Sequence, residues 1–184
     1  MVNQLMLGNN NGVQPKAETS VVGQQFLRFH LFPDTTVLLP VTQMIEVLTI
    51  PVNQVVPIPN MSPWVMGVYN WRGEILWNID LGSLLGLTPL YQQTITRTNY
   101  TTIVLVSRQQ LTGKNQITGR QSLGVVVDKV EDMEWCNTDL IQSPPQSSIT
   151  TELAPFLRGY WVKQNGEMLM VLDGEAIILG VNKE

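Results

Sequence analysis

Few residues of this 184-residue chain have side chains suited to catalysis or metal binding. The sequence contains one histidine, His30, and one cysteine, Cys136, so a zinc site or a histidine-activated nucleophile lacks partners. Carboxylates gather at 128–134 around Lys129. A catalytic carboxylate pair would need a pocket that raises one pKa, and we interpret this cluster as a solvated strand edge. Phosphate-binding, serine-hydrolase and zinc-protease motifs do not occur, and we therefore expect no enzyme activity, no cofactor and no metal.

An arginine and a tryptophan beside a tight turn indicate recognition instead of catalysis. Trp71 and Arg72 directly precede Gly73, and both residue types are enriched at the hot spots of protein interfaces. The alternatives are an ordinary solvated arginine and a tryptophan packed in the core. Because Trp71 flanks a turn, we do not expect it to be fully buried.

An internal repeat positions this turn. Residues 63–86 and 155–180 align at offsets of 92 to 94, and chance similarity is the alternative. Each copy predicts a strand, a tight turn, a return strand, an aspartate that caps a short helix, and a glycine that ends it. The matched pairs are Pro63 and Pro155, Gly67 and Gly159, Gly73 and Gly166, Glu74 and Glu167, Leu76 and Leu169, Asp80 and Asp173, and Gly86 and Gly180.

The two copies differ at the turn itself. Arg72 stands where the second copy has Asn165, and asparagine suits a hairpin turn better than arginine. If shared residues serve the fold, this difference marks Arg72 as a candidate functional residue.

Short strands separated by turn signals dominate the rest of the chain. Residues 26–32 alternate apolar and polar side chains, and further strand-like runs occupy 35–41, 75–79, 101–106 and 123–127. Together with the repeat, they predict a mainly β fold, a barrel or a sandwich, with two similar subdomains in one domain.

The composition narrows the function classes. The net charge is −4 and charged residues make up 14%, so a basic nucleic-acid footprint is not expected, and we predict an apolar core between the subdomains. One cysteine cannot close an internal disulfide, and no apolar run reaches the roughly 18 residues that span a bilayer. We expect a cytoplasmic protein without direct membrane insertion, and a flexible tail at 1–22.

The chain from 24 to 180 resembles the CheW coupling proteins of bacterial chemotaxis. The resemblance rests on FLRFHLF, VLLPV, QMIEVLTIP, PIPNMSPWVMGVYNWRGEIL and IDLGSLLGL, and later on LGVVVDKVEDM, the PP loop and FLRGYWVKQNGEMLMVLDGE. Trp77 stands where the family usually has proline, Trp71 replaces a common leucine, and Gly174 interrupts the last helix start. The segment NWRGEILW is similar to the cyanobacterial, PilI-like branch that serves type IV pilus-dependent phototaxis.

This resemblance implies a CheW-like domain over 23–182, with two facing five-stranded SH3-like β-barrels and a few short helices. The first barrel would centre on 26–87 and the second on 100–180. The implied role is a non-catalytic adaptor between the cytoplasmic tip of methyl-accepting receptors and the regulatory domain of a CheA-type histidine kinase, at membrane-bound receptor arrays.

Family positions linked to partner binding match Glu46, Gly67, Arg72 and Gly73, and we add the neighbouring Trp71 to them. A solvated carboxylate is the alternative for Glu46, and a purely conformational role is the alternative for the two glycines. We also expect the Arg72 guanidinium to lie at the surface of the first barrel, near Glu46.

A second hypothesis is a small-molecule-binding β-barrel module. It would need a cavity of about 300–1,000 Å³ with convergent polar groups. A packed core between the barrels without such a cavity would disfavour it.

Overall fold

The computed structural model describes residues 23–107, 121–143 and 149–182; the expected tail at 1–22 and the PP loop at 144–145 lie outside them. These ranges are mainly β, which confirms the expected fold class. The strands are β1 (Gln24–Leu31), β2 (Thr35–Pro40), β3 (Met44–Pro51), β4 (Val65–Trp71), β5 (Glu74–Asp80), β6 (Asn99–Val106), β7 (Ser122–Val127), β8 (Lys129–Cys136), β9 (Leu157–Val162) and β10 (Met168–Leu172). The α-helices are α1 (Leu81–Leu84) and α2 (Gly174–Val181). No helix in the described ranges is long and apolar enough to cross a membrane.

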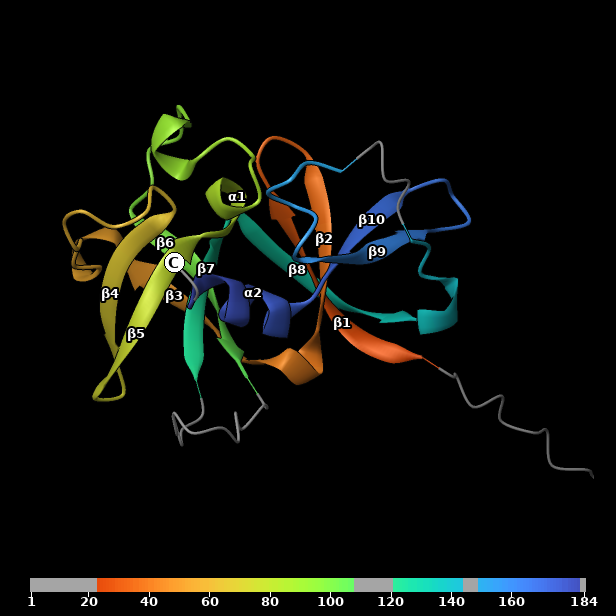
Figure 1. The fold of residues 1–184 in the computed structure, drawn as a ribbon, viewed down its shortest axis with the longest axis horizontal. Coiled ribbons are helices and arrows are strands. Elements are labelled where there is room, and N and C mark those ends of the chain that lie inside the picture. The colour runs from red at the N-terminus through yellow and green to blue at the C-terminus, as the bar shows by residue number, and fades with distance from the viewer. Residues whose placement is uncertain (1–22, 108–120, 144–148, 183–184) are drawn as a thin grey trace, which may run out of the picture.

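The strands form two curled five-stranded sheets that lie side by side (Figure 1). One has the order β8-β1-β2-β10-β9 and the other the order β3-β6-β7-β5-β4. An isolated bridge between Gln142 and Tyr160 links the chain after β8 to β9, and a bridge between Val56 and Val68 links the chain after β3 to β4. Because each bridge joins the two edges of one sheet, we call the sheets barrel A and barrel B, in that order.

The two barrels repeat one topology with an exchange of strands. Position by position, each strand of barrel B differs from its counterpart in barrel A by five in chain order. Barrel A combines β1 and β2 with β8, β9 and β10, whereas barrel B is built from the continuous stretch 44–127. The expected division into barrels centred on 26–87 and 100–180 is therefore wrong. The sequence repeat is real, and each copy stays within one barrel: 63–86 supplies β4 and β5 of barrel B, and 155–180 supplies β9 and β10 of barrel A. Strand pairing between distant segments, which a local pattern does not encode, joins β1 and β2 to the barrel of the second copy.

The two hairpins that the repeat predicts are present and lead into helices with the same cap. Asp80 accepts a hydrogen bond from Ser83 N at the start of α1, and Asp173 accepts from Glu175 N and Ala176 N at the start of α2. Gly86 follows α1 at φ +77°, but Gly180 lies inside α2. A Cβ at Gly180 would lie 2.6 Å from the ring of Phe156, so this glycine serves close packing and not helix termination.

An apolar core fills the space between the barrels, as expected. One face of each sheet contributes to it: Phe29 and Leu39 from barrel A, and Ile103 and Val125 from barrel B, are all at most 1% exposed. Both helices add side chains to the same core. Burying this surface joins the two barrels into one packed unit.

Candidate functional site

The tip of the β4–β5 hairpin lies against the edge strand β3 and brings three of the expected site residues together. Trp71 donates a hydrogen bond from Nε1 to Glu46 Oε1 at 2.6 Å, and Arg72 donates from Nη2 to Glu46 Oε2 at 2.8 Å. The Arg72 guanidinium also lies 5.2 Å from the centroid of the Trp71 ring. Glu46 therefore anchors both side chains, and the expected contact between Arg72 and Glu46 is present. We call Glu46, Trp71 and Arg72 the hairpin cluster.

The cluster presents its arginine to solvent. The Arg72 side chain is 67% exposed, whereas that of Glu46 is only 26% exposed. Pairs exposed in this way typically contribute about 0–1 kcal/mol to stability. The guanidinium keeps N–H groups of its planar fork free for a partner, which suits recognition better than stabilisation.

The hairpin holds Arg72 in a backbone conformation that arginine rarely adopts. Its φ is +54°, and Gly73 follows at +86° with its N–H bonded to Asn70 Oδ1 at 3.0 Å. Two successive positive φ angles define a type I′ turn, which favours asparagine or glycine at the first position. Gly166 repeats the second angle at +85°, but Asn165 has no positive φ. The two turns therefore differ, contrary to the expectation that they share one geometry.

The backbone conformation and the close packing at position 67 require glycine. Its φ is +138°, and a Cβ there would lie 2.1 Å from the carbonyl oxygen of Val56, where barrel B closes. Gly159, its counterpart in barrel A, would place a Cβ 2.6 Å from the carbonyl oxygen of Gln142. Both repeats thus need glycine at this position for backbone packing. At Gly73 a Cβ would have no heavy atom within 4 Å, so only its φ restricts the residue.

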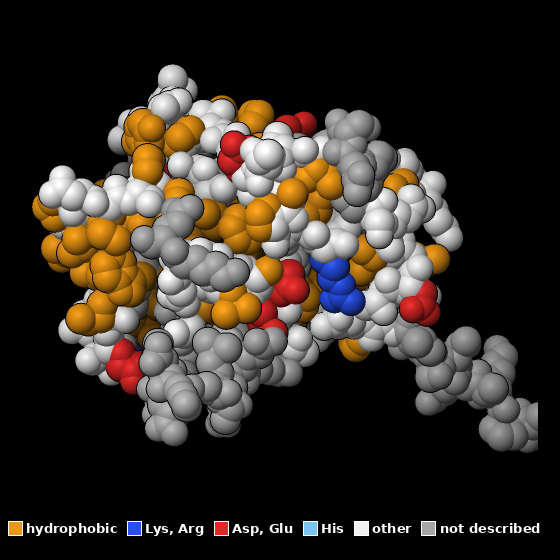
Figure 2. Space-filling view, in the orientation of Figure 1, with side chains coloured by type: hydrophobic (Ala, Val, Ile, Leu, Met, Phe, Trp, Pro, Cys, Tyr) orange, Lys and Arg blue, Asp and Glu red, His pale blue; other side chains and the backbone are white. Residues whose placement is uncertain are grey.

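Exposed apolar side chains that the sequence analysis did not select lie close along the strands to the residues of the hairpin cluster. Ile75 is 74% exposed one residue into β5, and Val47 is 39% exposed beside Glu46. Ile75, Trp77 and Ile79 share one face of β5, and exposure along it falls from 74% at Ile75 to 1% at Ile79, which packs in the core between the barrels. The alternation along β5 does not show which end of this face the other barrel covers, so the sequence did not indicate that Ile75 is exposed. Figure 2 shows hydrophobic side chains gathered over the end of the molecule where β4 and β5 lie.

Apart from the exposed Asp132, the acidic residues at 128–134 are paired with basic side chains and are not simply solvated. Arg28 reaches Glu131 at 2.8 Å, Glu134 at 3.5 Å and Glu167 at 2.5 Å, and these carboxylates are only 20–29% exposed. The pKa of Glu131 is lowered, chiefly by its hydrogen bond with His30, and the pKa of Glu167 is lowered, chiefly by its hydrogen bond from Arg28. The network ties β1, β8 and the β9–β10 hairpin together, which gives it a structural role in barrel A.

The remaining candidates for chemistry have other surroundings. Cys136 is fully buried, and burial raises the pKa of its thiol to about 11, so it is not a reactive nucleophile. No group of His, Cys, Asp and Glu within the described part of the chain is arranged to hold a metal ion.

Two pockets open beside barrel B: one of about 400 Å³ that Trp64 and Trp77 line, and one of about 440 Å³ that includes Asp80.

Two five-stranded barrels packed face to face, with strands exchanged between them, define a class of two-barrel β domains. The family model for the CheW-like domain matches residues 25–180, and the chain therefore belongs to the CheW-like domain family. Among solved structures, the crystal structure of scaffolding protein TtCheW from Thermoanaerobacter tengcongensis shares the fold with a TM-score of 0.62. It is 22% identical, and the match covers 82% of this chain and 88% of that one. No curated protein sequence matches the chain.

Proposed function

We propose that this chain is a non-catalytic adaptor that couples methyl-accepting receptors to a CheA-type histidine kinase in a chemosensory array. The observation that carries the proposal is the family match over 25–180 combined with the exposed hairpin cluster. A coupling protein needs surfaces and not a titratable site, and many weak contacts become strong when they are repeated in an array. The proposed location is the cytoplasm, at membrane-bound receptors.

Within this role, we assign partner binding to Glu46, Trp71 and Arg72. Arg72 would contact the partner directly, Trp71 would supply an aromatic surface beside it, and Glu46 would hold both in place. Gly67 and Gly73 would act indirectly, because they set the backbone that carries the cluster.

The decisive experiment is titration calorimetry of the full chain against the kinase regulatory domain and a receptor tip fragment. Arg72→Ala should weaken binding to at least one partner about tenfold, which corresponds to about 1.4 kcal/mol. Arg72→Lys should not restore the affinity, since lysine lacks the planar fork. Arg158→Ala removes another exposed arginine, on β9, and serves as the control. Unchanged affinity of Arg72→Ala for both partners would refute the assignment.

A finer proposal concerns the biological setting. The NWRGEILW segment favours a pilus-dependent phototaxis system over flagellar chemotaxis. A pull-down from native lysate, followed by identification of the kinase and receptor that co-purify, tests this point. Recovery of a flagellar chemotaxis kinase would contradict it.

The small-molecule module receives no support from the space between the barrels, because apolar side chains fill that space. The two pockets beside barrel B lie elsewhere and are compatible with an adaptor.

A further inference from the structure

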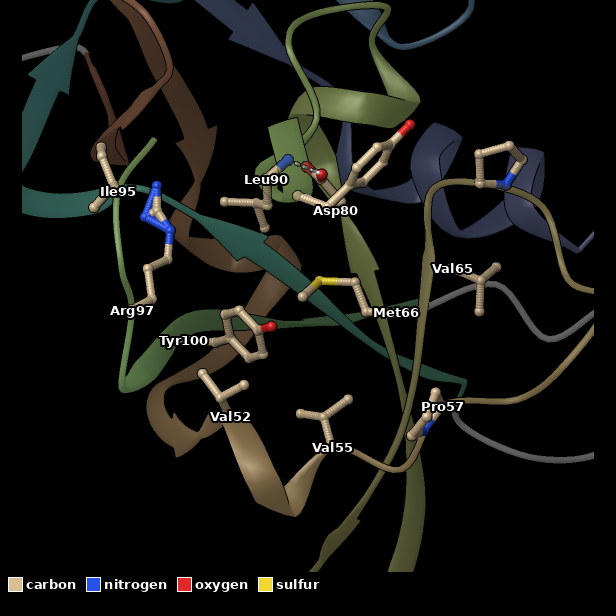
Figure 3. Close-up of a pocket in the computed structure, with 12 residues that line it drawn as sticks. Val52, Val55, Pro57, Val65, Met66, Asp80, Leu90, Ile95, Arg97 and Tyr100 are labelled. Atoms are coloured by element: carbon tan, nitrogen blue, oxygen red, sulfur yellow. Dashed lines mark hydrogen bonds between the residues drawn. The ribbon is translucent and has the colours of Figure 1, made fainter. Parts of the chain in front are cut away.

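The pocket of about 440 Å³ opens at one end of barrel B (Figure 3). Its volume lies within the range of about 300–1,000 Å³ that is typical of small-molecule sites. The wall is mostly apolar and comes from the chain after β3, from β4 and from residues 90–100. Its apolar members include Val52, Val55, Met66, Leu90 and Ile95.

The charged groups that line the pocket already have bonding partners within the protein. Asp80 accepts hydrogen bonds from Ser83 N at 3.1 Å and from Leu90 N at 2.6 Å. Arg97 is paired with Asp128, and it also bonds to Gln93. An anionic ligand would therefore lose its hydration without gaining a free cation. A cationic ligand would meet a carboxylate that is only 4% exposed and already bonded on both oxygens, so a charged ligand of either sign is disfavoured.

Hydrogen-bond donors, in contrast, remain unpaired. Among the residues that the structure describes, the Tyr100 hydroxyl has no hydrogen-bond partner, and Figure 3 shows it directed toward Met66 across the pocket. Arg97 Nε is also buried without an acceptor. The pocket thus offers apolar surface and an unpaired hydroxyl.

The interior beneath the pocket differs from that of barrel A. In barrel B, Gly124 pairs with Asn78, whereas at the matching place in barrel A Leu38 pairs with Val171. Asn78 and Thr102 are both fully buried, and within the described chain Asn78 Oδ1 and Thr102 Oγ1 have no partner. Asp80 lies two residues beyond Asn78 on the same face of β5, and Tyr100 lies two residues before Thr102 on the same face of β6. Both Asp80 and Tyr100 line the pocket. Barrel B therefore holds two polar side chains in its interior beneath the pocket, where the interior of barrel A is apolar at the matching level.

We propose that this end of barrel B binds a small, uncharged, mostly apolar molecule whose hydrogen-bond acceptor is received by the Tyr100 hydroxyl. This binding is separate from the proposed coupling role, because the hairpin cluster does not line the pocket.

The test uses the full ¹⁵N-labelled chain and two soluble probes of similar size, acetophenone and benzoate, titrated by amide NMR. Acetophenone should bind with a dissociation constant on the order of 1 mM and shift the amides of pocket residues. Benzoate should bind at least several-fold more weakly. Tyr100→Phe should weaken acetophenone about two- to tenfold, which is the effect of one hydrogen bond. Val55→Trp should block the pocket, and Val162→Trp on β9 is the matched control.

Several outcomes would overturn the proposal. One is the absence of saturable amide shifts at acetophenone concentrations up to 10-fold above the expected dissociation constant of about 1 mM. Another is a set of shifts confined to the pocket at Trp64 and Trp77. A third is tighter binding of benzoate than of acetophenone. An unchanged acetophenone affinity in a folded Tyr100→Phe would remove the role of Tyr100. If Tyr100→Phe does not fold, two results still test whether the pocket binds an uncharged molecule: the difference in affinity between acetophenone and benzoate, and the loss of binding in Val55→Trp. None of these results depends on receptor or kinase binding, so a failure here is distinguishable from a failure of the coupling role.

Discussion

Arg72 combines an exposed side chain with a left-handed backbone. An L-residue other than glycine costs roughly 1–2 kcal/mol in this region, and such strain often marks a functional position. The second repeat avoids the strain, because Asn165 has no positive φ. Arg72, which stands where the turn favours asparagine or glycine, is thus also the residue whose side chain offers free N–H groups.

Two substitutions of Arg72 distinguish the contribution of its side chain from that of its backbone conformation. Arg72→Gly and Arg72→Ala both remove the guanidinium, but only glycine relieves φ +54°. We expect Arg72→Gly to be about 1 kcal/mol more stable than Arg72→Ala in urea unfolding, with equally weakened partner binding. Equal stability of the two variants would show that the turn relaxes without cost.

The glycines Gly67 and Gly73 should respond differently to the same substitution. Gly67→Ala places a Cβ 2.1 Å from the Val56 carbonyl oxygen and should cost about 3 kcal/mol of unfolding free energy. Gly73→Ala meets no atom within 4 Å and should cost only about 1 kcal/mol, the cost of its φ. Chemical denaturation of both variants measures the difference. A small effect at Gly67 would mean that the closure of barrel B is soft.

Among the elements, the hairpins were predictable and their pairing was not. Arg72-Gly73 and Asn165-Gly166 are short-range turn signals, and Asp80 and Asp173 are local helix caps. Beyond its hairpin partner, β5 pairs in parallel with β7, and β10 pairs in parallel with β2, choices that depend on distant segments. The same holds for the site. The Arg72 turn could be identified from its difference from Asn165, whereas the burial of Asn78 depends on which face of β5 meets the barrel interior. The exposure of Ile75 depends on which part of the other face barrel A covers.

The charged network of barrel A should make stability depend on acid pH. The pKa values of Glu131 and Glu167 are lowered in the folded state, so their contribution is present above the unfolded pKa near 4.5 and is lost as pH falls below it. We expect the melting temperature of the wild type to fall below about pH 4.5. The fall should be smaller in Glu131→Gln/Glu167→Gln. Glu74→Gln, on an exposed residue of β5, is the control and should follow the wild type. A steeper fall in the double variant would contradict the assignment.

At the scale of the whole molecule, strand exchange and the shared core make the two barrels interdependent. Residues 1–97 hold β1 to β5 and residues 98–184 hold β6 to β10, and each set lacks strands that complete a barrel. We expect each fragment alone to lack dispersed amide NMR signals, and an equimolar mixture to regain them. Native-like signals from either fragment alone would show that a half can close its own barrel.

The exchange of strands also has a historical consequence. Two copies of one five-stranded chain that traded their last three strands, and were then joined end to end, would give this topology. In a dimer of identical chains, every substitution appears on both barrels at once. Covalent fusion removes that constraint, and each barrel can then diverge alone. The two barrels of the present molecule differ in the way that such freedom allows: one turn carries Arg72 and the other Asn165, and one barrel interior holds Asn78 where the other holds Val171.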